Sequence, residues 1–314
     1  MNRPVVVVGS VNLDRVQTVA TLPAPGATVH GTSFATFHGG KGANQAVAAA
    51  RMGAPVHFLG AVGDDAEGAR LRAALVADGI DVAGLRTLDG PTGFATILVA
   101  DDGENVIVLE AGANGRLLPD HLDPSAFVGA AVALFQLEVP LATVRRGLEL
   151  ARAAGATTVL NAAPPVGADA LPAELVDVLV VNATEAAALA SSADALMRSA
   201  DALASGADAR DPAALLDALA ARYATVVLTL GADGVAWARG AERGRRAARR
   251  VPVVDTTGAG DTFTGALVAG MAAGVPWGEA LERATIAASL CVGVAGAQAS
   301  IPRAADVDRV RGAG

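Results

Sequence analysis

The chain has little of what several protein classes require. It contains one cysteine, Cys291, so no disulfide can form within it, and this fits a reducing compartment. Only 18% of its 314 residues are charged, whereas 52% are hydrophobic. Disordered chains combine high charge with low hydrophobicity, so we expect a folded protein.

Basic residues are also few. Lys and Arg number 24 against 32 Asp and Glu, which gives a net charge of −8. Basic patches supply most of the non-specific affinity for nucleic acid, so we expect no nucleic-acid partner. The apolar run near the amino terminus is too short for a secretory signal. Two uncharged stretches, 262–278 and 284–302, are rich in small residues, and we expect them to be buried helices of a soluble, cytoplasmic protein that contacts no membrane.

Several catalytic and cofactor signatures are absent. The sequence has no G-x-x-x-x-G-K-[ST] loop and no G-x-G-x-x-G after its first apolar run, which argues against a P-loop enzyme and a dehydrogenase. It also lacks H-E-x-x-H, a cysteine pair and G-x-S-x-G, so neither a built-in zinc site nor a hydrolase nucleophile is expected.

Short runs of β-branched residues alternate with segments of helical spacing. This alternation predicts an α/β fold with a mostly parallel central sheet flanked by helices. The predicted strands are 5–8, 56–59, 97–99, 132–135, 158–160, 178–181 and 226–230, and the clearest helices are 42–52, 68–78, 141–154 and 212–223.

Two regions, 11–37 and 91–112, lack helical spacing. Residues 101–105 separate two short apolar runs and predict a β-hairpin. We expect these regions to form a small β-rich subdomain, with 1–10, 38–90 and 113–314 as the α/β body. Residues 190–211 predict a surface helix and loop, and the five arginines within 243–250 predict a solvated hairpin edge.

The most informative segment is Asp255–Phe263, with the sequence DTTGAGDTF. It follows the strand-like run 251–254 and precedes a long apolar helix. Small residues at 258–260 let backbone N–H groups converge on an anion at the helix N-terminus. Asp261 then has two interpretations. It either caps the helix or accepts a proton from an alcohol during phosphoryl transfer.

Two further segments suggest a ligand site. In Gly39–Ala46, GGKGANQA, glycines permit close backbone approach to a ligand and Asn44 can present its amide to a hydroxyl, although a loop rigidified for packing is the alternative. Asn12 and Asp14 share one face of an extended segment and could bind sugar hydroxyls, although this segment taken alone favours a surface turn. Loops at the carboxyl ends of parallel strands meet at one sheet edge, where ligands bind.

Together these segments resemble the ribokinase-like (PfkB-type) carbohydrate kinase family. The resemblance covers nearly the whole chain, with its blocks in the expected order. The blocks are 9–14, 23–26, 39–46, 136–138, 161–164, 182–185, 229–231, 255–263 and 296–300. It implies ATP-dependent phosphorylation of the 5-hydroxyl group of D-ribose, or of a similar small sugar.

The resemblance also implies a role for individual residues. Asp261 would be the general base, and the amides of Gly258, Ala259 and Gly260 would form the anion hole. The sugar would contact Asn12, Asp14, Gly40, Lys41, Asn44, Glu138 and Asp261. The nucleotide would contact Asn182, Thr229, Gly231, Gly260 and Thr285.

Two cations are implied in the same way. Glu185 would organise Mg²⁺ through water, in keeping with the preference of Mg²⁺ for few carboxylates plus phosphate oxygens. A K⁺ ion would activate the enzyme from a loop comprising Asp255, Thr257, Cys291, Val294, Gly296 and Ser300. The β-rich subdomain would be a lid that excludes water and pairs with a second copy to form a homodimer.

The sequence is also compatible with other functions. The same fold could phosphorylate 2-deoxyribose, a ketohexose, or a nucleoside such as adenosine or pseudouridine, although the 3% aromatic content and the polar set around Asn12 favour a free sugar. A non-catalytic sugar-binding protein is a further alternative, against which the intact Asp261 and Glu185 argue.

Overall fold

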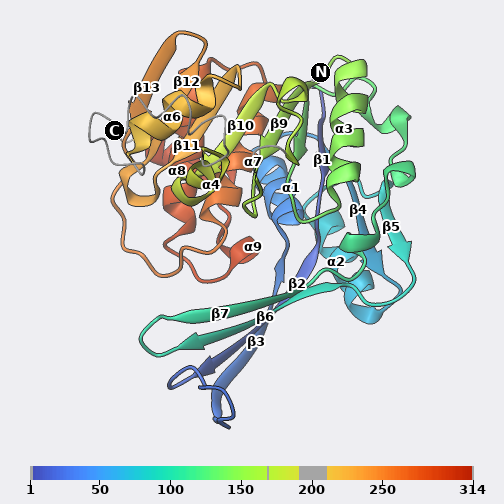
Figure 1. Cartoon of the computed structure of the whole chain (residues 1–314), viewed down its shortest axis with the longest axis vertical. Helices are drawn as coiled ribbons and strands as arrows, with labels where there is room; N and C mark the ends of the chain where they lie inside the picture. Colours follow the sequence, from blue (N-terminus) through green and yellow to red (C-terminus); the bar gives the residue numbers. More distant parts are fainter. Residues whose placement is uncertain (1–2, 168–169, 191–210, 313–314) are drawn as a thin grey trace.

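A nine-stranded sheet forms the centre of the molecule (Figure 1). The structure is a computed structural model that describes residues 3–167, 170–190 and 211–312. In spatial order the strands are β13 (Glu242–Arg246), β12 (Val235–Arg239), β11 (Thr225–Thr229), β10 (Val178–Asn182), β9 (Thr157–Asn161), β8 (Val132–Phe135), β1 (Val5–Val8), β4 (Val56–Gly63) and β5 (Leu85–Leu88). All are parallel to their neighbours from β11 to β5, whereas β12 and β13 are antiparallel. The predicted mostly parallel sheet is therefore confirmed.

Helices cover both faces of this sheet because its strands alternate between two cores. In β1, Val5 and Val7 face one core, whereas Val6 and Val8 face the other. The first core is covered by α1 (Lys41–Arg51), α2 (Ala66–Ala77), α7 (Ala259–Ala272), α8 (Trp277–Cys291) and α10 (Ala304–Gly312). The second is covered by α3 (Leu141–Ala153), α4 (Ala183–Ala190) and α6 (Pro212–Ala220).

Short helical turns complete the connections. They are η1 (Asn114–Arg116), η2 (Pro119–His121), η3 (Pro124–Phe127), η5 (Ala173–Leu175), η6 (Gly231–Asp233) and α9 (Ala297–Ser300). The uncharged stretches 262–278 and 284–302 lie mostly in α7, α8 and α9, and α7 is almost entirely buried. No helix within the described ranges is long and apolar enough to cross a membrane. The helix and loop predicted at 190–211 lie, except for the two end residues, outside the described residues.

A second, four-stranded sheet projects from the body (Figure 1). Its order is β3 (Gly31–Gly39), β2 (Asn12–Val19), β6 (Gly93–Ala100) and β7 (Asn105–Glu110). Strands β2 and β6 are parallel and the outer pairs are antiparallel. The hairpin predicted around 101–105 is confirmed as β6 and β7. The division into a body and a lid subdomain remains a prediction, and β3 itself continues two residues beyond the expected boundary at 37.

The run 251–254 does not form the strand that the sequence predicts. The amide of Val254 donates to the carbonyl of Val292, the residue that follows α8. Residues 251–254 thus bond to a loop instead of to a strand. Strand β13 is the edge of the described sheet, so the chain has left the sheet before it reaches Val251. Val253 and Val254 are both more than 60% exposed.

Helices α1 and α7 pack directly against each other beneath the carboxyl edge of the sheet. A Cβ atom at Gly265 of α7 would lie 2.4 Å from the carbonyl oxygen of Gln45 and 2.5 Å from the Cβ of Ala48. Both neighbours belong to α1, so the two helix axes can approach this closely only because position 265 has no side chain.

We expect Gly265→Val to lower the free energy of unfolding by about 1–3 kcal/mol or more, since overpacking forces the two helices apart. Urea denaturation followed by circular dichroism measures this change. Gly278→Ala is the matched control, because Gly278 also lies in a helix but has no atom within 4 Å of the added Cβ. That variant should be as stable as the parent or slightly more so. Equal stability of the two variants would contradict the described contact.

Candidate active site

Asp261 lies in the first turn of α7 and is only 7% exposed. The helix begins after Gly258, which has a φ of 77° and supplies no side-chain cap. The carboxylate instead reaches across to α1, where Oδ2 accepts from Asn44 Nδ2 at 3.0 Å and Oδ1 accepts from Gln45 Nε2 at 2.8 Å. The capping interpretation is therefore wrong, because the side chain points to a neighbouring helix rather than to its own amides.

The N-terminus of α1 is capped from outside the helix. Gly40, its N-cap residue, has a φ of 87° and no side chain to offer. Glu138, which follows β8, takes this role: its Oε2 accepts from the Lys41 amide at 3.0 Å and from Ser10 Oγ at 2.6 Å. Gly42 lies directly on the Ser10 turn, since a Cβ there would be 2.6 Å from the Ser10 amide. The loops after β1, β3 and β8 therefore meet at one point.

Asn12 and Asp14 enter this cluster from β2, so the surface-turn alternative is wrong. Asn12 is buried, and its Oδ1 accepts from Asn114 Nδ2 at 2.7 Å. Since its oxygen is engaged, the amide nitrogen of Asn12 is the group left free to donate. Asp14 lies over Gly39, where a Cβ would be 2.2 Å from its Oδ2, so a side chain at position 39 would displace the carboxylate.

The cluster is acidic and contains one cation. Burial, followed by the charges of Glu138 and Asp261, raises the pKa of Asp14 to about 7. The charge of Asp261 raises the pKa of Lys41, with Glu138 and Glu185 adding to it against the effect of burial. Lys41 is therefore a firmly protonated ammonium among carboxylates.

One atom of the cluster lacks a partner. Asn44 Oδ1 is buried and accepts no hydrogen bond from any described residue. A buried acceptor without a donor costs about 1–3 kcal/mol, so a donor brought to this atom by water or by a ligand would stabilise the site. A hydroxyl-rich ligand supplies such donors, and the acidic cluster around it supplies further acceptors.

A cavity of about 550 Å³ lies on the other side of the α7 N-terminus. Five of the predicted nucleotide and anion-hole residues line it: Thr229, Gly231, Ala259, Gly260 and Thr285. The first amides of a helix have no acceptor within the helix, which suits them to an anion. Here the Ala259 amide donates to the Thr256 carbonyl just before the helix, at a long 3.3 Å. Asp261 follows Gly260 directly, and its side chain points to the polar cluster instead.

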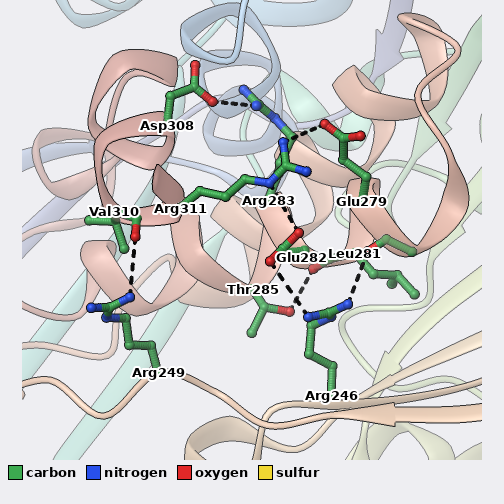
Figure 2. A network of polar contacts seen from close by, with 11 residues as sticks. Arg246, Arg249, Glu279, Leu281, Glu282, Arg283, Thr285, Asp308, Val310 and Arg311 are labelled. Atoms are coloured by element: carbon green, nitrogen blue, oxygen red, sulfur yellow. Dashed lines mark hydrogen bonds and ion pairs between the residues drawn. The ribbon is translucent and has the colours of Figure 1, made fainter. Parts of the chain in front are cut away.

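The outer wall of the cavity is tied to the C-terminal helix. Arg249 lines the cavity, donates its amide to Ser289 Oγ at 3.3 Å and donates from its guanidinium to the Val310 carbonyl at 3.4 Å. Figure 2 shows the bond from Arg249 to the Val310 carbonyl beside a network of ion pairs. In that network, Arg311 donates to Glu279 and Glu282, and Arg246 also pairs with Glu282. The arginines predicted on a hairpin edge thus include two cavity residues, Arg249 and Arg250.

Asn182 and Glu185 form a compact pair between β10 and α4. Glu185 Oε2 accepts from the Asn182 amide at 2.8 Å and Oε1 accepts from Asn182 Nδ2 at 2.9 Å. Burial raises the pKa of Glu185 above its usual value. Asn182 does not line the 550 Å³ cavity. Both oxygens of Glu185 are already engaged, which suits an indirect role through water better than direct ligation.

The predicted cation loop is brought together in two parts. Asp255 joins them: it accepts from the amides of Thr257 and Gly296, and these bonds lower its pKa although burial acts in the opposite direction. Deeper in the loop, Cys291 Sγ lies 2.9 Å from Ser300 Oγ and 3.9 Å from the Thr257 carbonyl oxygen. Val294 is half exposed, and its side chain has no polar group to add.

Five buried side chains complete the site, and the sequence reasoning assigned none of them. Asn161 and Gln136 bond to Gln45, Ser10 bonds to Glu138, and Asn114 fixes Asn12. Gln45, Gln136, Ser10 and Asn161 stand within blocks that resemble the carbohydrate kinases. Asn114 carries no such signal. It bonds to both the amide and the carbonyl of Val11, about a hundred residues earlier in the chain, which only the fold reveals.

Comparison with known proteins identifies relatives along the whole chain. Residues 2–304 match the model of the pfkB family carbohydrate kinases. The ribokinase of Schizosaccharomyces pombe is 37% identical over 97% of this chain and 96% of that protein, and the ribokinase of Staphylococcus aureus is 36% identical over 99% and 100%. Among solved structures, Arabidopsis thaliana ribokinase complexed with ribose and ATP superposes with a TM-score of 0.84, at 30% identity and with 99% of each chain covered.

The raised pKa of Asp14 predicts how stability depends on pH. The folded protein holds this proton up to about pH 7, whereas the unfolded chain releases it near pH 3.8, the ordinary pKa of an aspartate side chain. Folding therefore becomes less favourable as pH rises between these values. We expect Asp14→Asn to gain stability relative to the parent from about pH 4 to pH 7, by about 1–4 kcal/mol, with a plateau above.

Urea denaturation of the ligand-free parent and variant at closely spaced pH values measures this difference. Asp123→Asn is the control, because the pKa of Asp123 is lowered by hydrogen bonds from Ser125, so its contribution has the opposite sign. A stability difference between Asp14→Asn and the parent that is flat from pH 4 to pH 7 would contradict the burial of a protonated Asp14.

Proposed function

The chain belongs to the pfkB family of carbohydrate kinases, and we propose that it transfers the γ-phosphoryl group of ATP to the 5-hydroxyl group of D-ribose, giving ribose 5-phosphate and ADP. One observation carries this proposal. The short segment Ala259–Asp261 serves two sites at once, since Ala259 and Gly260 line the nucleotide-sized cavity while Asp261 faces the polar cluster. A phosphoryl group bound at these amides would lie beside a hydroxyl held by Asp261.

The chemistry then follows from the residues present. An oxygen of Asp261 takes the proton of the sugar hydroxyl as that oxygen forms its bond to the γ-phosphorus. The bond from this phosphorus to the bridging oxygen of ADP breaks, and ADP leaves with the electron pair. The amides of Gly258, Ala259 and Gly260 at the start of α7 stabilise the charge on the transferring group.

The polar cluster supports a free sugar as the substrate. We propose that Asn12, Asp14, Lys41, Asn44 and Glu138, with the backbone at Gly40, contact the ribose hydroxyls. Only 3% of the chain is aromatic, so the apolar slot that a nucleoside base requires is poorly provided for. The unpartnered Asn44 Oδ1 favours a ligand that donates at that point, and a sugar lacking the corresponding hydroxyl would leave it unpaired.

On the nucleotide side, we propose that Thr229, Gly231, Gly260 and Thr285 hold ATP in the cavity and that Asn182 with Glu185 acts near its phosphates. The described residues contain no group of three or more His, Cys, Asp or Glu that could hold a metal ion. We therefore propose that Mg²⁺ arrives bound to ATP and that Glu185 positions it through water. When bound, Mg²⁺ neutralises phosphate charge. The single cysteine is compatible with work in the reducing cytoplasm.

We also propose that K⁺ binds the loop of Asp255, Thr257, Cys291, Val294, Gly296 and Ser300. The donor set fits a weakly hydrated cation: one carboxylate, one hydroxyl and backbone carbonyls within a small volume. Ser300 Oγ donates to the Ala297 carbonyl, so Cys291 donates to Ser300 and the hydroxyl retains a free lone pair. This loop flanks the segment that begins α7, so a bound ion would order the anion hole without touching the substrate.

The lid sheet supports a homodimer as the working form. All six residues of β7 are exposed, and four of them are apolar: Val106, Ile107, Val108 and Leu109. Phe34 on β3 is 62% exposed. Because β7 is an edge strand, its backbone and both of its faces are open to a partner, and such an edge is unstable unless it is covered. We propose that a second copy covers it.

Asp261→Asn should lower kcat with D-ribose by about 10²–10⁴-fold, because the amide cannot take the proton. ADP release measures turnover with ribose, 2-deoxyribose, fructose and adenosine, each in potassium chloride and in choline chloride. Ribose should be the best substrate, with faster turnover in potassium. A preference for another substrate would overturn the choice of ribose while keeping the reaction. Ribose binding without any turnover by the parent protein would indicate a binding protein.

Ile107→Asp should convert a dimer to a monomer, since a charge placed at the centre of the edge strand cannot be buried against a second copy. Light scattering after gel filtration measures the mass, with 31.0 kDa expected for one chain. Val76→Asp is the control, because Val76 is 54% exposed on α2 of the body and lies outside the lid. A parent protein of monomer mass at all concentrations would contradict the proposed dimer.

A further inference from the structure

Gln45 occupies the centre of a buried chain of amide side chains that ends at Asp261. Its Nε2 donates to Asp261 Oδ1 at 2.8 Å and to Asn161 Oδ1 at 2.9 Å, and its Oε1 accepts from Gln136 Nε2 at 2.6 Å. Gln45 and Gln136 have no exposed surface, and Asn161 and Asp261 are less than a tenth exposed. The chain links α1, α7 and the carboxyl ends of β8 and β9.

These bonds leave the Gln45 amide a single orientation. Reversing it would place Oε1 against the oxygens of Asp261 and Asn161 and would place Nε2 against the nitrogen of Gln136. Asn161 is fixed in turn, since its Nδ2 donates to the Val180 carbonyl on β10. Gln136 donates through Nε2 to Gln45, and its Oε1 lies against Gly9 with no hydrogen-bond partner among the described residues. The orientation of Gln45 is thus set by the sheet.

The two oxygens of Asp261 therefore have different surroundings. Oδ1 faces Gln45, which contacts only protein groups. Oδ2 faces Asn44, whose own Oδ1 is without a partner on the side of the polar cluster. A carboxylate free to rotate would present either oxygen to the substrate, whereas one held at Oδ1 presents Oδ2 alone.

We propose that Gln45 is a positioning residue that holds Asp261 Oδ1, so that Oδ2 is the oxygen that takes the proton from the sugar hydroxyl. Gln136 acts one step further back by orienting the Gln45 amide. This inference rests on the proposed role of Asp261 as the general base. It assigns a task to side chains that touch neither the sugar nor the nucleotide.

The test compares Gln45→Met, which keeps the length of the side chain and removes its hydrogen bonds, with Gln136→Met and with the double variant. Steady-state kinetics with D-ribose and ATP give kcat and both KM values. We expect Gln45→Met to lower kcat by about 10- to 100-fold, because a small displacement of a catalytic group has effects of that size. The KM for ribose should change by less than about threefold, since the sugar contacts remain.

The double variant separates positioning from a general loss of stability. Gln136 acts only through Gln45, so Gln136→Met should cost less, and Gln45→Met with Gln136→Met should be no slower than Gln45→Met alone. Thr143→Val is the control: it removes a fully buried hydrogen bond from Thr143 on α3 to the Leu117 carbonyl, and it should lower the melting temperature while leaving kcat unchanged.

The possible outcomes are distinct. The proposal is overturned if kcat for Gln45→Met lies within about threefold of kcat for Thr143→Val. It is also overturned if the losses of the two single variants multiply in the double variant. If Gln45→Met does not fold, Gln136→Met decides alone: a lower kcat with an unchanged KM for ribose supports the proposal, and an unchanged kcat overturns it. A parent protein that releases no ADP with ribose would refute the proposed function instead, so the two failures are separable.

Discussion

The close contact between α1 and α7 is the constraint on which the rest of the site depends. Glycine at position 265 lets α7 approach α1 until its backbone meets the Gln45 carbonyl. Two successive residues of α1, Asn44 and Gln45, can then hold both oxygens of one carboxylate on α7. The N-termini of both helices lie at this edge of the sheet. The first amides of α1 are paired with Glu138 and Ser10, whereas those that begin α7 are proposed to bind an anion. In the proposed reaction, anion binding and proton acceptance therefore depend on a single packing contact.

The cluster around Asp261 opposes folding and favours binding for the same reason. Burial raises the pKa of Asp14, and the nearby charges of Glu138 and Asp261 add to the effect. Lys41 offsets part of this repulsion, and Glu138 is further stabilised by the Ser10 hydroxyl and the first amide of α1. A ligand rich in hydroxyl groups supplies the donors that the empty cluster lacks. The cost of holding these groups together is thus recovered on binding.

The sequence predicts the sheet and the main site loops because their signals are local. The runs 5–8 and 132–135 are strands with those same bounds, since each is a β-branched or apolar run bounded by polar or small residues. The glycine loop before α1 is recognisable for a similar reason. The run 251–254 misleads because its composition is strand-like, whereas here Val251 and Val253 line the cavity and the Val254 amide bonds to the residue after α8 instead of to a strand. The sequence does not reveal the role of Asn114, because that role depends on a contact with Val11 that only the fold creates.

The small sheet and the proposed potassium loop are in contact at one point, where Phe37 meets Gly296. A Cβ at Gly296 would lie 3.0 Å from the ring of Phe37 on β3, so the ring lies flush against the backbone of position 296. The amide of Gly296 is bonded to Asp255, and Asp255 is bonded to Thr257, one residue before the glycine that begins α7. A movement of β3 therefore cannot leave this loop undisturbed. The same few residues connect the position of the proposed lid with the geometry of the amides proposed to receive the phosphoryl group. If sugar binds at β2 and a cation at this loop as proposed, one aromatic ring and one carboxylate give the two sites a contiguous path for coupling.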